Sequence, residues 1–501
     1  MRLISGSADE HGSERRAVVI GASLAGMAAA AALAHHLDHV TVIERDRLPH
    51  GPVWRRGVAQ SRHAHNLMAA GHRGLERLLP GITRELDTHG MVTVRMPQDM
   101  LMFGPGGWIP RFDSDLTMLT GSRDTLDSVL RARLRDHPKV TFMEQTEAVS
   151  LRAGRDDTVS GVWVRRREPD SETGWTRPEI LPAGFVVDAA GRKSRAPQWL
   201  EELGYGTAPE TVVDARTAYA TTVFAPPLGH VADWKCMLIL ATPDTPRQGI
   251  LNPIEGGKWM VSLSASGGER PPTDHAGFLE YAKTLRSPVL HEAIEHATPL
   301  GPVHGSGRTE NRWHHYEKMR RWPDGFLVLG DAAAGFNPSY GQGMSVAVQC
   351  ALLLDDALGR HGTTRALTYG LRRAQARHIL AAWQIATGVD LQYPWAAEPC
   401  PPDLVTRLSQ RYISRIAATA PTNPTAARVL LELTQLTAAP TAVFRPGVIA
   451  AAVRGPRGQA PTAPPSTTHG ANATRARRTT TTGTAPADPA PTTQHPSVTG
   501  G

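Results

Sequence analysis

Two glycine-rich segments and two acids, far apart in the chain, could together bind a nucleotide. The first segment, Gly21-Ala-Ser23-Leu-Ala-Gly26, is a G-x-S-x-x-G variant of the dinucleotide fingerprint. Gly21 permits a tight turn and Gly26 lets a helix approach a strand closely, while Ser23 stands where the backbone must approach a phosphate. The helix N-terminus that follows offers unpaired N–H groups and a positive dipole end to a pyrophosphate.

Glu44 is the first acid. It lies 23 residues beyond Gly21, where a carboxylate can accept hydrogen bonds from both ribose hydroxyls. A carboxylate at that place also repels a 2′-phosphate, so the pattern predicts FAD or NAD as the ligand. The alternative is a helix packed on a sheet with no ligand.

Asp331 is the second acid, and it follows the apolar run Phe326–Leu329. Pro338 and the pair Gly341 and Gly343 come next, and they indicate a loop and a helix start. A ligand lying across the carboxyl end of a sheet would contact this arrangement. An N-capping acid in a strand-turn-helix would explain Asp331, but it would not explain the two glycines as well.

The residues around the first segment predict the elements that position it. Arg16–Gly21 is a short apolar strand, Leu24–Leu33 is a helix of small residues, and Val40–Glu44 is a second strand. This order is a βαβ unit with parallel strands, so we predict an α/β fold with a doubly wound sheet.

Residues 205–308 carry a different pattern, which predicts an antiparallel sheet in a separate substrate domain. The expected strands are Tyr219–Phe224, Lys235–Leu240, Gly249–Ile254 and Trp259–Leu263. The stretch from Glu255 to Gly257 joins the last two as a hairpin turn.

The end of the chain divides into two regions. Apolar residues recur at helical spacing in Leu404–Ala418 and Thr425–Leu436, so we expect a helical C-terminal region over residues 360–454. From Gly455 onward Pro, Thr, Ala and Gly dominate. Burial of such a segment cannot offset its ordering entropy, and we predict a disordered tail over residues 455–501.

Composition narrows the class of protein. The formal net charge is +7, of which residues 455–501 carry +3, so the folded body is nearly balanced. This gives little support to nucleic-acid binding. No window supplies the roughly eighteen apolar residues of a membrane span, and residues 1–16 lack the apolar core of a signal peptide. We expect a cytoplasmic protein without membrane insertion, and the sequence leaves its oligomeric state open.

The cysteines and histidines offer no clear metal site. Cys236, Cys350 and Cys400 are odd in number and far apart, which fits neither a disulfide framework nor a clustered metal site, and we expect ordinary buried thiols. His63, His65 and His72 have no cysteine or evident carboxylate set at ligand spacing, so a structural or flavin-proximal role is expected. We assign no metal ligand and no catalytic residue.

The stretch around Asp331 resembles the Gly-Asp motif of group A flavin monooxygenases, the superfamily of para-hydroxybenzoate hydroxylase and squalene epoxidase. The resemblance implies that Asp331 bonds the ribityl chain of FAD. It also implies that Pro338, Gly341 and Gly343, with Met344, lie beside the isoalloxazine ring. A helix N-terminus there would stabilise the anionic reduced flavin.

Other positions are assigned by the same resemblance. Arg123 is similar to the family arginine that reaches the flavin's phosphate or ribityl region, a role that suits a guanidinium fork. Ala148, after the strand Val140–Gln145, is similar to a stretch whose backbone borders the adenine. Gln60 is placed near the flavin, and Arg45 joins Glu44 in the cofactor-binding set.

The resemblance also implies the domain organisation. We expect a glutathione reductase-type FAD-binding domain over residues 14–204 and 309–359, with a candidate pocket insertion near residues 85–115. The substrate domain, residues 205–308, would be inserted in it.

Within the superfamily, several segments resemble the actinobacterial polyether-type epoxidases of monensin and lasalocid biosynthesis. They are Arg56–His65, Ile254–Trp259, Pro271–Asp274, Arg321–Gly325 and Ala386–Pro394. The resemblance implies secondary metabolism, in the biosynthesis of an antibiotic-like product. It implies FAD, a transient NAD(P)H reductant, dioxygen and a lipophilic small molecule, with oxygen transfer through a flavin C4a-hydroperoxide.

We favour epoxidation of an alkene in a polyketide- or terpenoid-like substrate. The expected substrate strands carry mainly apolar side chains, such as Met237–Ile239, Ile250, Leu251, Met260 and Val261. They contain no His or Tyr pair that would suggest removal of a phenolic proton. The alternatives are an aromatic hydroxylase of the same superfamily and a non-catalytic or redox-sensing flavoprotein.

Overall fold

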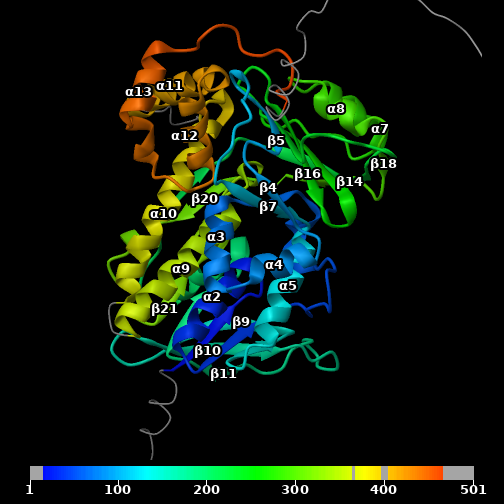
Figure 1. The fold of residues 1–501 in the computed structure, drawn as a ribbon. Helices are drawn as coiled ribbons and strands as arrows, with labels where there is room; N and C mark the ends of the chain where they lie inside the picture. Colours follow the sequence, from blue (N-terminus) through cyan, green and yellow to red (C-terminus); the bar gives the residue numbers. More distant parts are fainter. Residues whose placement is uncertain (1–14, 308, 364–366, 397–403, 467–501) are drawn as a thin grey trace, which may run out of the picture. The chain divides into compact units, whose positions relative to one another are not determined.

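Figure 1 shows the fold in a computed structural model, which describes residues 15–307, 309–363, 367–396 and 404–466. A five-stranded parallel sheet lies at its centre, in the order β21-β12-β1-β2-β8. These strands are β1 (Arg16–Ile20), β2 (His39–Ile43), β8 (Val140–Met143), β12 (Phe185–Asp188) and β21 (Phe326–Val328). The parallel pairing of β1 with β2 confirms the predicted βαβ unit and the doubly wound α/β fold.

The helix α2 (Leu24–His36) packs in the interior because its side chains are small and apolar. Residues Met27–Ala34 are all buried. It contacts the sheet and the helix α9 (Gly343–His361), so two helices that begin near the carboxyl edge of the sheet lie side by side.

The second large sheet confirms the four predicted substrate strands. They are β14 (Ala218–Ala225), β15 (Cys236–Ile239), β16 (Arg247–Ile254) and β17 (Lys258–Ala265). The pairs β14 with β17, β17 with β16, and β16 with β15 are antiparallel, and η3 (Glu255–Gly257) forms the predicted turn.

This sheet also contains strands that the sequence analysis did not assign to it. β5 (Met100–Gly104) pairs in parallel with β15, and β6 (Gly107–Trp108) follows β5, while β18 (Thr298–Pro299) and β19 (His304–Ser306) pair with β14. Two short strands from the expected pocket insertion near residues 85–115 are therefore part of the substrate sheet, whereas β4 (Val92–Arg95) pairs with β7 (Thr117–Gly121) in another sheet.

The two faces of this sheet have different surroundings. One face presents Phe224, Ile239, Leu251 and Val261, which form a core with α7 (His275–Lys283) and α8 (Val289–Ile294). Figure 1 shows these helices beside β14 and β16. Cross-strand pairing places Tyr219, Thr221, Gln248, Ile250, Ser262 and Ser264 together on the opposite face.

Smaller elements complete the fold. The additional strands are β3 (His65–Leu67), β4 (Val92–Arg95), β7 (Thr117–Gly121), β9 (Thr146–Ala153), β10 (Val159–Arg166), β11 (Glu179–Pro182), β13 (Glu210–Val213), β20 (Asn311–His314) and β22 (Ala334–Gly335). The additional helices are α3 (Ala69–Leu78), α4 (Ile82–Thr88), α5 (Arg123–Arg135) and α6 (Ala196–Glu202). Within the described ranges no helix is long and apolar enough to cross a membrane.

The predicted helical C-terminal region is confirmed in its helices. They are α10 (Leu367–Asp390), α11 (Leu404–Thr419), α12 (Pro424–Thr434) and α13 (Pro446–Arg454). Residues 455–466 form no helix or strand, and the N–H of Arg457 donates to Thr422 Oγ1 at 3.0 Å. Residues 467–501, the larger part of the predicted tail, lie outside the described residues, as does Cys400. Cys236 and Cys350 are buried free thiols, as expected.

Candidate functional site

The first glycine-rich segment forms a tight turn between β1 and α2. Gly21 has a φ of +100°, a backbone conformation that favours glycine. A Cβ atom on Gly26 would lie 1.8 Å from the carbonyl oxygen of Gly21, so helix and strand touch directly. Ser23 is the N-cap residue of α2, and its side chain makes no capping hydrogen bond. The first turn of α2 is thus not capped by Ser23, which suits a phosphate ligand.

Glu44 lies at the end of β2, as predicted, and it also holds this turn. Its Oε2 accepts a hydrogen bond from the N–H of Ala22 at 3.0 Å and pairs with Arg55 Nη1 at 2.9 Å. Arg55 is buried, and its Nη2 donates to the carbonyl oxygen of Ala22 at 2.9 Å. The sequence analysis missed Arg55, because a pair of arginines after Trp54 carries no motif of its own.

Glu44→Ala is expected to raise the dissociation constant for FAD and to lower the stability of the protein. The variant would leave the buried Arg55 guanidinium with Asp46, 3.6 Å away, as its remaining carboxylate partner. Breaking a buried pair on one side costs about 3–5 kcal/mol. Equilibrium FAD binding and chemical denaturation would measure the two effects. Glu44→Gln, which keeps an acceptor oxygen, should lose less stability, and equal losses in both variants would contradict this account.

Asp331 follows β21 at the same edge of the sheet. Its carboxylate is about a third exposed, and the part of the chain that the structure describes gives it no hydrogen-bond donor. The closest cation is Arg192, whose Nε lies 3.7 Å from Oδ2. Burial raises the pKa of Asp331, while the charges of Arg192 and Arg123 oppose that rise. A Cβ on Gly343 would lie 3.5 Å from Oδ1, so this carboxylate faces the start of α9.

The segment between Asp331 and α9 carries further polar atoms without partners. Among the described residues, Ser339 Oγ and Gln342 Oε1 of this segment, and Arg192 Nε beside Asp331, are buried and make no hydrogen bond. Buried polar atoms without partners are rare in folded proteins and call for an explanation. A cofactor with hydroxyl groups and ring nitrogens would supply donors to Asp331 and partners to these atoms. The residues present therefore fit FAD.

The structure places several other predicted residues around this edge. Arg123 begins α5 behind the N-cap Ser122, is buried, and donates from Nε to Asp127 Oδ1 at 2.7 Å. Its charge opposes the rise in the pKa of Asp331 and contributes, after burial, to the lowered pKa of His65. Burial is the main cause that lowers the pKa of His65, to about 3.

The remaining predicted cofactor residues are distributed over four segments. Gln60 lies in η1 (Arg56–Arg62) and is partly exposed, Ala148 is buried in β9, and Arg45 is exposed with Glu147 Oε1 at 3.8 Å. Pro338 begins η6 (Pro338–Tyr340), Gly341 has a φ of +67°, and Met344 is partly buried in α9. Contact of each of these residues with FAD stays a prediction.

A histidine and a tyrosine meet on the face of the substrate sheet opposite α7 and α8. The rings of His63 and Tyr219 are 4.5 Å apart between centroids. His63 Nδ1 shares a hydrogen bond of 2.9 Å with Thr221 Oγ1, which in turn bonds to Ser262 Oγ at 2.6 Å. The substrate strands themselves contain no His and Tyr pair, and the pair forms because His63 reaches Tyr219 from the segment after η1.

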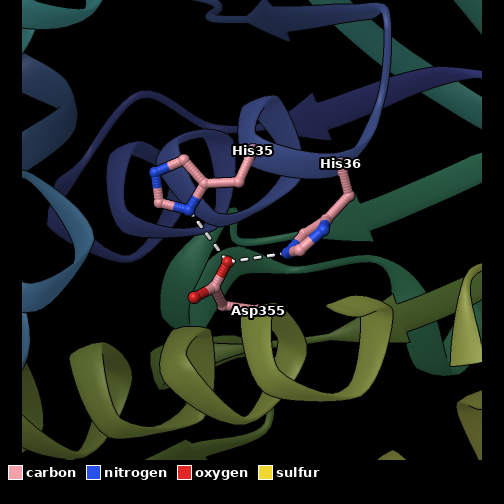
Figure 2. A group of neighbouring side chains, drawn as sticks. All are labelled: His35, His36 and Asp355. Atoms are coloured by element: carbon pink, nitrogen blue, oxygen red, sulfur yellow. Dashed lines mark hydrogen bonds and ion pairs between the residues drawn. The ribbon is translucent and has the colours of Figure 1, made fainter. Parts of the chain in front are cut away.

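One group of side chains within the described ranges has the composition of a metal site. Figure 2 shows that His35 and His36, at the end of α2, both point to Asp355 of α9. Each ring nitrogen lies 2.9 Å from Asp355 Oδ1. Two ligand atoms on a tetrahedral zinc ion would be about 3.4 Å apart, since each bond is about 2.1 Å long. Hydrogen bonds account for this geometry, and the contact ties α2 to α9.

The comparison with protein families shows to which family this chain belongs. Residues 14–389 match the family model described as FAD binding domain. The chain belongs to this FAD-binding family. This chain is 32% identical over 392 residues to Protein Rv3254 of Mycobacterium tuberculosis (strain ATCC 25618 / H37Rv). The aligned region covers 77% of this chain and 82% of that protein.

Solved structures show that the fold of this FAD-binding protein is shared by different enzymes. The p-nitrophenol 4-monooxygenase PnpA from Pseudomonas putida DLL-E4 is 18% identical, with a TM-score of 0.58 over 84% of this chain and 97% of that one. The flavin-dependent brominase Bmp2 is 13% identical, with a TM-score of 0.62 over 87% of this chain and 98% of that one. The family match shows an FAD-binding protein, and these structures show that its fold is shared with a monooxygenase and a brominase.

Proposed function

We propose that this FAD-dependent monooxygenase uses NAD(P)H and dioxygen to epoxidise an alkene in a polyketide- or terpenoid-like natural product. The observation that carries the proposal is the mixed apolar and hydroxyl lining of the substrate-sheet face that lies opposite α7 and α8. Leu238, Ile250 and Ser262 are partly exposed on that face, whereas their neighbours Ile239, Leu251 and Val261 are buried under α7 and α8. A substrate on this face would meet apolar side chains and hydroxyl groups together, which suits an oxygenated hydrocarbon.

This face is linked directly to the segment that follows Asp331. Gln248 Nε2 donates to the carbonyl oxygen of Ser339 at 3.3 Å, and Asn337 Nδ2 donates to Thr217 Oγ1 at 3.2 Å. A molecule lying against Ile250 would therefore be next to the loop that we assign to the isoalloxazine ring. The contacts support transfer of oxygen between a flavin and a substrate held by this sheet.

FAD supplies the activation of dioxygen when it is bound and reduced, and the protein has three tasks. Glu44 and Asp331 would accept hydrogen bonds from hydroxyl groups of the cofactor, and the N-termini of α2 and α9 would stabilise its negative charges. The face of the substrate sheet opposite α7 and α8 would orient the alkene. Close packing of both parts excludes water, so that the oxygen atom reaches the substrate and is not released as peroxide. Oxygen transfer to an alkene needs little proton chemistry at the substrate.

Aromatic hydroxylation is the second candidate, and the contact between His63 and Tyr219 favours it. Burial lowers the pKa of His63 to about 4, with smaller contributions from His304 and Arg62. The imidazole is neutral at neutral pH and has a nitrogen that can accept a proton. The neutral ring could accept a hydrogen bond from a phenolic substrate on the same face and orient it, whereas the lowered pKa makes His63 a weak base.

The test is incubation of the purified protein with NADH or NADPH, dioxygen and a panel of terpenoid and polyketide alkenes and phenols. Mass spectrometry should find one added oxygen atom in an alkene, and derivatisation should identify an epoxide. Products with a new aryl hydroxyl group and no epoxide would favour the second candidate. A non-catalytic flavoprotein would show no substrate-dependent uptake of dioxygen.

His63→Ala is expected to separate the two reactions. Epoxidation should keep most of its rate, whereas hydroxylation of a phenol should fall by about threefold to tenfold, the effect of losing one hydrogen bond to the substrate. In the unmodified protein, a group with a pKa of about 4 stays neutral above pH 6, so His63 should add no inflection to the rate between about pH 6 and pH 9. Equal losses in both reactions would show that His63 only supports the fold.

A further inference from the structure

Asp390 ends the long helix α10 in an environment that disfavours a carboxylate. Its side chain is buried. The carboxyl end of a helix carries the negative end of the helix dipole, so a negative charge is unfavourable there. Among the described residues no Lys, Arg or His forms an ion pair with Asp390. A buried charge in such a place persists only where specific hydrogen bonds hold it.

Three side chains supply those hydrogen bonds. Tyr340 Oη donates to Asp390 Oδ1 at 2.5 Å and Asn311 Nδ2 donates to Oδ2 at 2.6 Å. Asn337 Nδ2 lies 3.4 Å from each oxygen. Burial raises the pKa of Asp390, and the hydrogen bonds from Tyr340, Asn337 and Asn311 oppose this rise.

Two of these donors belong to the segment that connects Asp331 with α9. Asn337 and Tyr340 flank Pro338, and the Asn337 Oδ1 accepts the N–H of Ser339 at 3.1 Å. The third donor extends the same network, since Asn311 Oδ1 accepts the backbone N–H of Asn337 at 2.8 Å. Asp390 thus accepts hydrogen bonds from a residue at each end of the short helix η6, Asn337 and Tyr340.

The segment has the features of a ligand-binding loop. It carries the buried and unpartnered Ser339 Oγ, is followed by the unpartnered Gln342 Oε1, and leads into Gly343 beside the Asp331 carboxylate. We propose that Asp390 is a positioning residue for FAD binding. Asp390 holds the segment from Asn337 to Gly341 in the conformation that receives the flavin. The proposal rests on FAD binding and not on the identity of the substrate.

The test compares Asp390→Asn and Tyr340→Phe with a control at the other end of the same helix. Asp324→Asn replaces the carboxylate whose Oδ1 accepts a 2.9 Å hydrogen bond from Thr368, near the start of α10, by a neutral amide that accepts more weakly. Asp324 precedes β21 and lies at the opposite edge of the sheet from Asp331. All three variants weaken the attachment of α10, but only the first two alter the loop.

The measurements are the dissociation constant of FAD from the purified holoenzyme, its visible flavin spectrum and the thermal melting of the protein. Asp390→Asn should raise the FAD dissociation constant about tenfold and Tyr340→Phe about threefold, each with a shifted flavin spectrum. Asp324→Asn should lower the melting temperature with the FAD constant within about twofold of the unmodified protein. Melting losses in the first two variants with unchanged FAD constants and spectra would overturn the proposal. If Asp390→Asn does not fold, the FAD dissociation constant and the flavin spectrum of Tyr340→Phe test the proposal by the same criteria.

Discussion

Asp331→Ala is expected to lower the affinity for FAD by about tenfold to a hundredfold. The described residues give this carboxylate no hydrogen-bond donor, so the ribityl hydroxyls of FAD would be its main partners. A hydrogen bond to a charged group contributes about 1.5–3 kcal/mol, which corresponds to this range of affinity. Titration of the flavin-free protein with FAD, followed by flavin fluorescence, would measure the change.

Removing the charge of Asp331 should, in contrast, raise the stability of the flavin-free protein. The folded protein raises the pKa of Asp331, so its ionised form is disfavoured in the fold. Stability is therefore lost as the pH rises from the ordinary pKa of an aspartate, about 4, through the raised value. Asp331→Asn should abolish this loss and should melt at a higher temperature than the unmodified flavin-free protein at pH 7.

The exposed acid Asp244, in the turn between β15 and β16, provides the control. Asp244→Asn should change neither the FAD affinity nor the dependence of melting on pH. Unchanged FAD affinity in Asp331→Ala would remove Asp331 from the cofactor site. Lower stability of Asp331→Asn without FAD would instead show that the carboxylate serves the fold.

Gly26→Ala is expected to abolish FAD binding and to destabilise the protein by about 3 kcal/mol or more. The added Cβ would lie 1.8 Å from the carbonyl oxygen of Gly21, and this atom belongs to the backbone and cannot rotate away. Helix α2 would have to move from β1. Its N-terminus would then leave the place where a pyrophosphate meets both the turn and the helix dipole.

Gly370→Ala offers a matched control, because Gly370 lies in α10 and a Cβ there would meet nothing within 4 Å. That variant should bind FAD normally and gain up to about 1 kcal/mol, since alanine favours a helix more than glycine does. Denaturation curves and the flavin content of both purified variants would test the pair. A yellow Gly26→Ala protein with normal stability would contradict the packing argument.

The sequence alone was sufficient to predict the part of the site that depends on local pattern. A short apolar run, a glycine turn and a helix of small residues predict one βαβ unit, and the structure confirms it between Arg16 and Ile43. Parallel strands direct their carboxyl ends to one edge of the sheet. Gly21, Glu44 and Asp331 therefore had to come together, although Asp331 is far from the others in the chain.

Contacts between distant segments could not be predicted in this way. Arg55 at Glu44, Asp390 at Tyr340 and His63 at Thr221 each join residues from different elements, and the last pair is 158 residues apart in the chain. No periodicity records which loop covers which strand. The parallel pairing of β5 with β15 was missed for the same reason.

The orientation of the substrate strands was likewise decided by the tertiary structure. Met237, Leu238 and Ile239 are apolar in succession, so alternation along the strand does not show which side chains face a helix. The helices α7 and α8 bury Met237 and Ile239, and Leu238 is left on the face that also carries Tyr219 and Thr221. An apolar run specifies burial, and only the packing of neighbouring elements determines which of its residues border a site.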